Sequence, residues 1–582
     1  MGKQLLIAIT VLSLATGCDS GDIVISPSTA DNSVDNSTNN SNNTTQAPTV
    51  AVNPCASYTN SGGQMIQGTF DGLDCEYAPS FVDVGNNLST DLTIPFLPDG
   101  GAHIFQGALF VGTSTDTDAG LAALGVSQGG DGPLLTVEAG ATVAFADETG
   151  FIQINRGSQI FAVGTESAPI TFTSQTDVDS MREVAAGNAP TLAYNAITQW
   201  GGIVINGFGI VNNSCDYTGT ITDNGDGTFN DSGVTLASPC HIRAEGSEGP
   251  STSHFGGDNN DDSSGRLEYV RVKHTGGQVV EGDDLNGIAF GGVGRNTTIE
   301  NLQIYSTFDD GIEFFGGAVD VTNFVALYVR DDSIDVDNGY KGRITNALVI
   351  QDATTGAHCM ESDGIGRYSG LPAMGAGSTA DLIARNLHSQ AQITNLTCIL
   401  SGEDAASNPP HDRGTGWRIR EAHMPDIDDT LVVMVGPDSP ETNYCLRIQH
   451  DGLQGAQDGD LTFDSIIFSC ADRTNGGSLP DATTVEAWAA ANGAQWATVA
   501  GGEDPTTTAD TDLVLLEGTP PIYSVPFAMM MVDGAAPTVA APASGHVGAV
   551  LQTDDWTANW TYGIHPGSRA PDSEVDGGLW FE

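Results

Sequence analysis

The chain has few basic residues, few aromatic side chains and no series of long apolar segments. Only 19 residues are Lys or Arg, against 74 Asp and Glu, so the formal net charge is −55. A surface of this sign repels nucleic-acid phosphates and anionic membranes, and it attracts divalent cations. We therefore expect no nucleic-acid partner. An acidic glycan would need a bridging metal or a local basic patch in order to bind.

Several motifs of known chemistry are also missing. The sequence contains no His-Glu-x-x-His pair and no phosphate-binding glycine loop, which disfavours zinc peptidases and nucleotide-dependent enzymes. It contains no Cys-x-x-Cys, which disfavours zinc ribbons, and no Cys-x-x-Cys-His, which disfavours attached haem. No run of membrane spans is present, which disfavours a transporter.

A repeat of about two dozen residues is the strongest positive signal. Asn301, Asn323 and Asn346 lie 22 and 23 residues apart in similar strand-like phrases, and a fourth copy ends at Cys398. Such a period is typical of a solenoid in which each coil stacks on the next. Glycine is abundant at 73 residues, and aromatics make up only 7%, which suits short strands joined by tight turns. The sequence therefore predicts an all-β solenoid.

The first residues read as an export signal. Residues 1–17 have a short charged start, an apolar stretch and small residues before Cys18. The segment resembles a bacterial lipobox, which implies that Cys18 is lipidated and that the protein is anchored in the cell envelope, facing the periplasm or the surface. The alternative is an ordinary signal peptide with an incidental cysteine. Residues 18–54 are polar and predict a disordered tether.

The remaining chain divides into three predicted regions. Residues 55–130 form an entry region, and residues 131–475 form the solenoid, with an inserted hairpin over 212–242. Residues 476–582 are expected to cap the open end, where strand edges lack partners. This cap contains the one helix that we expect, over residues 484–497, which are rich in alanine.

Eight cysteines follow Cys18, and an even number outside the cytoplasm favours disulfides. Eight cysteines allow 105 connectivities, so the sequence does not settle the pairing. The simplest hypothesis joins nearest neighbours along the chain, as Cys55–Cys75, Cys215–Cys240, Cys359–Cys398 and Cys445–Cys470.

Several segments resemble known β-helix proteins. The alternating string that begins at Leu135 is similar to the first coils of right-handed parallel β-helix proteins of the pectate-lyase-like fold. The segments Gly291-Gly292-Val293-Gly294, Asp309-Asp310-Gly311-Ile312-Glu313 and Asp555-Trp556 resemble a family of bacterial surface lipoproteins with a β-helix. The resemblance implies a right-handed parallel β-helix with loop insertions. Members of this family are mostly without an assigned function.

Acidic residues recur at matching positions of neighbouring coils. Ile288, Ile312 and Ile334 occupy equivalent places, and neighbouring coils lie about 4.8 Å apart. Acids stacked at this distance predict a Ca²⁺ site. Two alternatives are turn aspartates that accept backbone amides and a catalytic carboxylate pair. The predicted metal ligands are Asp309, Asp310, Glu313, Asp331, Asp332 and Asp335.

A second oxygen-rich loop includes Asp258 and Asp262. It lacks the distal glutamate of an EF-hand but offers enough oxygen atoms for Ca²⁺. The alternative is a solvated loop that is stabilised by its own Asx turns.

Two alternating strands carry the main basic cluster. Aligning their isoleucines places Arg418 over Arg447 and Arg420 over Gln449. This pattern resembles the place where polysaccharide lyases hold uronates and use an arginine as base, so the three arginines are candidate catalytic residues. The alternative is ion pairing with neighbouring acids, namely Asp412, Glu421, Asp426 or Asp451.

Three functional hypotheses follow. The first is a non-catalytic, envelope-anchored lipoprotein whose Ca²⁺-stabilised β-helix displays loops for extracellular glycan or protein binding. The second is a Ca²⁺-dependent polysaccharide lyase, or another carbohydrate-active enzyme, that acts on acidic glycans. The third is a structural filament built by end-to-end stacking, which the atypical C-terminus disfavours. The sequence favours the first, and so it favours a protein that is not an enzyme.

Overall fold

The computed structural model describes residues 53–568, with several gaps. The gaps are residues 83–84, 86, 247–251, 281–282, 353–354, 369–377, 402–414, 436–443, 471, 499–511 and 567. The predicted signal peptide, Cys18 and nearly all of the predicted tether therefore lie outside the described residues. No helix in the described part is long and apolar enough to cross a membrane.

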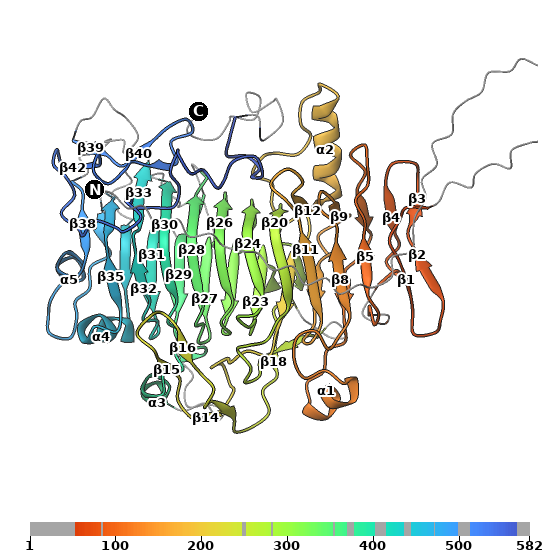
Figure 1. Cartoon of the computed structure of the whole chain (residues 1–582), viewed down its shortest axis with the longest axis horizontal. Helices are drawn as coiled ribbons and strands as arrows, with labels where there is room; N and C mark the ends of the chain where they lie inside the picture. Colours follow the sequence, from red (N-terminus) through yellow and green to blue (C-terminus); the bar gives the residue numbers. More distant parts are fainter. Residues whose placement is uncertain are drawn as a thin grey trace, which may run out of the picture. The chain divides into compact units, whose positions relative to one another are not determined.

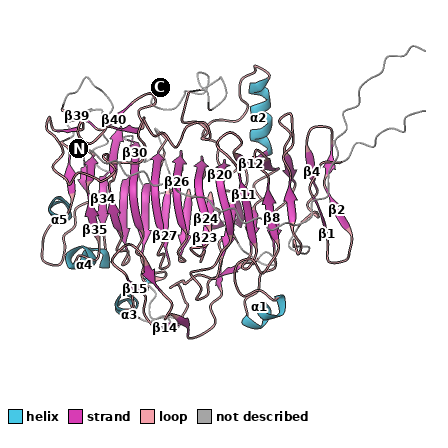
Figure 2. Ribbon diagram, viewed as in Figure 1, coloured by secondary structure: helices cyan, strands magenta, loops and turns pink. Residues whose placement is uncertain are grey.

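Short strands from successive coils form one parallel sheet of ten strands (Figures 1 and 2). Hydrogen bonding follows chain order along the axis of the coils. The strands are β7 (Leu109–Val111), β10 (Ile152–Ile154), β13 (Ile203–Asn206), β23 (Ile288–Gly291), β25 (Ile312–Phe315), β27 (Ile334–Asp337), β29 (His358–Asp363), β31 (Thr415–Arg420), β34 (Tyr444–Ile448) and β37 (Asp472–Thr474).

The second sheet has 18 strands, and its long central strands bend at one residue each. We call the part of each strand before this bend the first arm and the part after it the second arm. Four consecutive bends are made by the asparagines of the repeat. The central strands are β20 (Gly265–Lys273), β24 (Thr298–Tyr305), β26 (Asp320–Leu327), β28 (Arg343–Ile350) and β30 (Gln392–Ser401).

The asparagines form a ladder along these bends. Asn301, Asn323, Asn346 and Asn395 have φ angles of 54°, 59°, 56° and 58°, in the left-handed region that asparagine tolerates better than most residues. Each side-chain amide donates to the oxygen of the preceding asparagine, at 2.9 Å in all three steps. The predicted all-β parallel β-helix is confirmed.

The core is a stack of apolar side chains inside the coils. Ile312 pairs in register with Ile288 on one side and Ile334 on the other, and all three are fully buried. Parallel coils begin before residue 131, because β6 (His103–Phe105) pairs with β9 (Thr142–Phe145) and β7 pairs with β10. The four disulfides join the nearest-neighbour cysteines, so the predicted pairing is confirmed.

The helix prediction was incomplete. The described residues contain α5 (Val485–Ala491), within the expected range, and four further helices. Four of these five helices begin at a residue whose side-chain oxygen caps the first turn, namely Thr117, Ser174, Ser378 and Thr484. The helix after His450 has no such cap. The four further helices are α1 (Asp118–Leu124), α2 (Gln175–Ala185), α3 (Thr379–Ala384) and α4 (Asp451–Asp458).

The C-terminal region does not act only as an end cap. Trp488 of α5 packs against Phe463 of the last coils, which fits the prediction. Residues 512–566, however, cover the outer face of the second arm (Figure 1). Gly548 donates to the carbonyl of Asp429, and the backbone of Tyr562 forms two hydrogen bonds with a side chain of β24. The outward side chains of the second arm are apolar, and therefore they require a cover.

Candidate functional site: a charged column on the ten-stranded sheet

One column of charged side chains runs along the outer face of the ten-stranded sheet. Strand register places Glu313, Asp335, Glu361, Arg418 and Arg447 one above the next, on β25, β27, β29, β31 and β34. We call these five residues the charged column. With coils about 4.8 Å apart, four steps span roughly 19 Å. The charge changes from acidic to basic along this length.

Strand alternation explains why these residues face outward. Ile312 and Phe314 flank Glu313 and belong to the core, as Ile334 and Val336 do beside Asp335. In a strand, successive side chains point to opposite faces. Each charged residue therefore points away from the core.

The turns that precede β25 and β27 add a second group of acids. Asp309, Asp310 and Asp331 each place a carboxylate oxygen within 4.8 Å of the others, and Asp310, Glu313 and Asp335 do the same. Asp310 also accepts a hydrogen bond of 3.0 Å from the backbone amide of Asp332. The structure thus brings the predicted acids together, and two of them, Asp310 and Asp332, also accept backbone amides as the alternative proposed.

These carboxylates are poorly solvated. Asp310 and Glu313 are each 7% exposed, and Asp332 is 4% exposed. Burial, reinforced by neighbouring acids, raises the pKa of Asp310, Glu313 and Asp335 well above the ordinary values. Within the described residues, none of these three forms an ion pair with a Lys, Arg or His side chain. Their ionised forms therefore lack a protein counter-charge.

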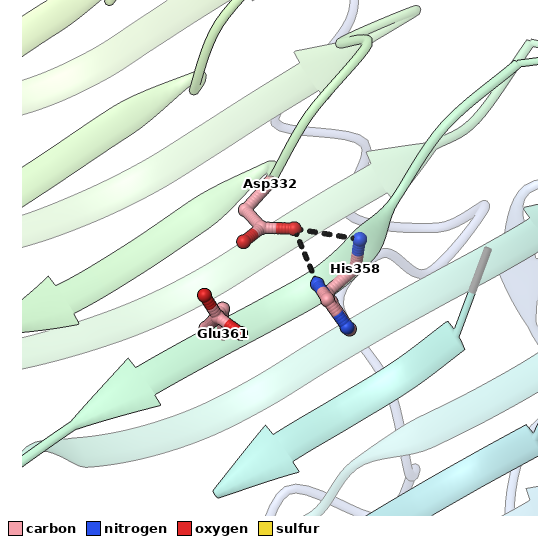
Figure 3. Close-up of side chains that lie close together, drawn as sticks. All are labelled: Asp332, His358 and Glu361. Carbon is pink, nitrogen blue, oxygen red and sulfur yellow. Dashed lines mark hydrogen bonds and ion pairs between the residues drawn. The ribbon is translucent and has the colours of Figure 1, made fainter. Parts of the chain in front are cut away.

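A third group of possible ligands lies one coil further along (Figure 3). Asp332, His358 and Glu361 have ligand atoms within 4.8 Å of one another. One carboxylate oxygen of Asp332 accepts from the backbone amide and lies 2.7 Å from Nδ1 of His358. Burial, followed by the charge of Asp332, raises the pKa of Glu361 to about 7. This group combines nitrogen and oxygen donors, whereas the Asp310 group contains oxygen alone.

Sequence analysis missed His358 and Glu361. The step from Asp335 to Glu361 is longer than the earlier steps, because a loop precedes β29. A count by a fixed period therefore loses the register at this point. The available signal was the strand-like string from His358 to Asp363, which has the same alternation as the preceding coils.

The basic end of the column is tied to its acidic middle. The predicted stacking of Arg418 on Arg447 is confirmed by the strand register. Arg418 and Arg420 form ion pairs of 2.7 and 2.9 Å with Glu361, and Arg420 forms another of 2.5 Å with Asp363. The ion-pairing alternative is therefore right in kind, but Glu421, Asp426 and Asp451 are not the partners seen, and Asp412 lies outside the described residues.

Arg420 and Arg447 differ in whether they are already paired with carboxylates. Burial lowers the pKa of Arg420, but the hydrogen bond to Asp363 and the charge of Glu361 outweigh it and raise the pKa overall. Arg420 therefore stays protonated and is a poor candidate for a base. Arg447 donates to the hydroxyl of Tyr444 at 3.3 Å and forms no ion pair with any carboxylate of the described residues. It is the better candidate for contact with a ligand.

The second predicted metal loop behaves differently. Asp258 is exposed and accepts from the amide of Leu236 at 3.1 Å. Asp262 is buried and accepts from the amides of Phe208, at 2.9 Å, and Gly129. Neither residue belongs to a group of three possible ligands in the described part of the chain. These hydrogen bonds join the loop to distant segments and are not Asx turns within it, so the alternative of a solvated loop does not describe the buried Asp262.

One further motif match has no catalytic context. Residues 125–129 read Gly-Val-Ser-Gln-Gly, a pattern found at the nucleophile of some hydrolases. Here the string follows the end of α1 instead of joining a strand to a helix. The hydroxyl of Ser127 donates at 3.0 Å to Asp131, a carboxylate four residues further along the chain.

Comparison with known proteins yields one match. The family described as the pectate-lyase like beta helix domain matches residues 122–502, which include every residue of the charged column. No curated protein and no solved structure matches the chain. Because the match covers more than half of the sequence, the protein belongs to the pectate-lyase like beta helix domain family.

Proposed function

We propose that the protein binds Ca²⁺ through Asp310, Glu313 and Asp335, and that it holds an acidic glycan along the charged column without cleaving it. One observation carries this proposal. The carboxylates of Asp310 and Glu313, which are buried, and of Asp335, which is half-buried, place oxygen atoms within 4.8 Å of one another, and none has a cationic partner among the described residues.

The ligand set favours a hard cation. Ca²⁺ takes six to eight oxygen atoms and accepts irregular geometry, and a group of carboxylates supplies oxygen alone. Uncompensated charges in a buried site destabilise the folded state. A divalent ion bound here neutralises the carboxylates and so removes this destabilisation. When bound, the ion supplies positive charge that attracts a carboxylate of the ligand.

The rest of the column supports a polymeric acidic ligand. A protein with a net charge of −55 repels a polyanion unless cations face it. The column offers the proposed Ca²⁺ at one end and Arg447 at the other, and a guanidinium binds a carboxylate through two hydrogen bonds. The family supports a carbohydrate-binding or lyase-like fold. A glycan that carries several carboxylates along its length fits both ends.

The proposed location is the bacterial cell envelope. Four disulfides fit an oxidising compartment. The lipobox-like sequence before Cys18 supports a lipid anchor. In this arrangement the tether over residues 18–54 separates the β-helix from the membrane, and the column is displayed to extracellular or periplasmic glycans.

The second candidate is a lyase that acts at the same column. The observation that favours it is the proximity of arginines to a candidate metal site on one sheet face. The pKa of Arg420 disfavours that residue as base, which leaves Arg447 as the candidate. Both functions predict Ca²⁺-dependent binding, but only the lyase produces unsaturated uronates.

The test uses the full chain after removal of metal with EDTA. Binding of alginate and polygalacturonate is measured by calorimetry with and without Ca²⁺, while absorbance monitors unsaturated uronates. Ca²⁺-dependent binding without a rise in absorbance supports the proposal, and a rise in absorbance selects the lyase.

The matched variants change two charges each. Glu313→Gln/Asp335→Asn should abolish Ca²⁺-dependent binding, whereas Glu76→Gln/Glu148→Gln, at two exposed acids, should leave it unchanged. Arg447→Gln should weaken glycan binding about tenfold, as expected for the loss of one charge-assisted contact worth about 1.4 kcal/mol. Equal glycan binding by all variants would contradict the proposal.

A further inference from the structure

A cavity of about 410 Å³ lies against the 18-stranded sheet, away from the charged column. Its lining residues come from α2, from β9, β12 (Ile170–Ser174) and β20, and from the C-terminal segment. Pockets for small ligands typically measure about 300–1,000 Å³. The cavity is therefore large enough for a molecule the size of a single ring.

The floor of the cavity is polar and is set by strand register. Thr142, Thr171 and Arg271 form one row across β9, β12 and β20. Thr173 and Lys273 follow two positions further along their strands and face the same side. The floor thus offers hydroxyl groups and two positively charged side chains on a rigid sheet.

The walls are largely apolar. Val178, Met181 and Ala185 project from α2, and Leu73 and Tyr562 close the sides. Tyr562 is fixed in place, because its backbone amide and carbonyl each form a 2.7 Å hydrogen bond with Gln303. Its ring also lies 3.7 Å from the ammonium group of Lys273. The wall can therefore pack against one face of a ring.

The cations of the cavity are not equivalent. Arg182 is paired with Asp74 through bonds of 2.6 and 2.8 Å, and Lys273 is paired with Asp177 at 2.7 Å. Arg271 donates from Nε to the carbonyl of Trp560 and forms no ion pair with any carboxylate of the described residues. Burial lowers the pKa of Arg271 to about 10, so it remains positive at neutral pH.

A half-buried guanidinium that has no carboxylate partner in the described part of the chain is uncommon in a protein with 74 acidic residues. Charged groups that are withdrawn from water are normally paired, because their desolvation is costly. The terminal nitrogens of Arg271 can donate to a carboxylate in bidentate fashion. The lining also contains the carboxylates of Asp99 and Asp177, and Asp177 is already paired with Lys273. Arg271 is thus the cation of the cavity that lacks a carboxylate partner among the described residues, and an anion with an apolar face fits both this guanidinium and the walls.

We propose that this cavity binds a small organic acid, a single six-membered ring that carries one carboxylate. Arg271 binds the carboxylate, the ring packs against Tyr562 and α2, and the threonine hydroxyls bind polar substituents. The site is separate from the charged column and does not depend on the proposed function. An aromatic acid and a sugar acid share this chemistry. They differ in the ring substituents that the threonine hydroxyls can bind.

The test measures binding of benzoate and glucuronate to the full chain by ligand-observed NMR and calorimetry. Each acid is compared with a neutral counterpart, benzamide or methyl glucoside. We expect one of the acids to bind at least tenfold more tightly than its neutral counterpart. Binding of benzoate identifies an aromatic acid, and binding of glucuronate identifies a sugar acid. Failure of both acids to bind, or equal binding of the neutral molecules, would overturn the proposal.

Variants assign the binding to the cavity. Arg271→Gln should weaken acid binding at least tenfold, and Arg271→Lys should weaken it less. Arg266→Gln is the matched control, because Arg266 lies on the same strand, pairs with Glu268 and does not line the cavity. Melting curves check that each variant is folded. If Arg271→Gln unfolds the protein, the acid and its neutral counterpart still decide the question with the unaltered chain, and unchanged affinity in a folded Arg271→Gln would refute the assignment.

Discussion

The ten-stranded sheet and the second arm of the 18-stranded sheet are built from the same coils, but the outer face of the first is charged and that of the second is apolar. On the second arm, outward residues such as Val325, Leu327 and Leu348 are apolar, and residues 512–566 cover them. On the ten-stranded sheet, the outward positions carry Glu313 and Asp335. The inward residues define the coil in both places, so the outward residues decide whether a face becomes a second core or a charged surface.

Removing a large side chain from the covering segment should have the largest effect. Trp560 is fully buried and its ring packs edge-on against Tyr269. We expect Trp560→Ala to lower the free energy of unfolding by about 3–5 kcal/mol, because it leaves a cavity over the second arm. Urea denaturation measures this change. Met529→Ala, at a residue that is 67% exposed on the same segment, is the control, with an expected change within about 0.5 kcal/mol.

Ca²⁺ should stabilise the protein through the acids of the ten-stranded sheet and not through the covered second arm. At a concentration one hundred times the dissociation constant, Ca²⁺ should raise the free energy of unfolding by about 2.7 kcal/mol. In Glu313→Gln/Asp335→Asn we expect no such rise. In EDTA this variant should be at least as stable as the unaltered protein, since it lacks two neighbouring carboxylates, one buried and one half-buried. Melting curves with and without Ca²⁺ measure both effects, and identical curves for the unaltered protein would exclude the site.

Substitution of a single asparagine tests the bend between the two arms. Asn323 has a φ of 59° and hydrogen bonds at 2.9 Å to the asparagines on either side. Asn323→Ala should cost about 2–3 kcal/mol, because alanine is strained in this conformation and cannot replace the amide bonds. Asn323→Gly keeps the conformation and should cost less. Equal losses of stability in urea denaturation would show that backbone strain plays no part.

The acids of the ten-stranded sheet should also make the free energy of unfolding of the metal-free protein depend on pH. Burial, followed by the charge of Asp363, raises the pKa of Asp337 to about 8. The folded protein then binds more protons than the unfolded chain between about pH 4 and pH 8, so stability is highest at the acidic end and falls as pH rises. In EDTA, each such group contributes a slope of up to about 1.4 kcal/mol per pH unit.

Asp337→Asn isolates one group in that profile. It should flatten the fall in stability between pH 5 and pH 8 by about the slope of a single group. Chemical denaturation at several pH values measures this difference. A profile that keeps its full slope in the variant would show that Asp337 is not held protonated.

The parts of the fold that sequence analysis predicted well are those with local and periodic signals. The asparagines at 301, 323 and 346 revealed the coil because each one makes the same left-handed bend. The isoleucines at 288, 312 and 334 then set the register that stacks the acids. Nearest-neighbour disulfides followed because cysteines close in sequence can face each other across the inside of the coils. Cys359 on β29 of the ten-stranded sheet, for example, bonds to Cys398 on β30 of the 18-stranded sheet.

The parts that it missed depend on contacts without a period. His358 and Glu361 follow a loop that breaks the count, so their place beside Asp332 emerges only from the strand register. The cover over the second arm joins Tyr562 to Gln303 across 259 residues, and nothing local predicts such a contact. The helix α2 was missed because its cap, Ser174, is also the last residue of the strand β12.

The most direct test of the account is a calorimetric titration of Ca²⁺ into the metal-free protein. We predict a saturable binding isotherm for the unaltered chain, loss of that binding in Glu313→Gln/Asp335→Asn, and full retention of it in Glu76→Gln/Glu148→Gln. The absence of saturable binding, or equal binding by all three proteins, would contradict the claim that the acids of adjacent coils form one cation site.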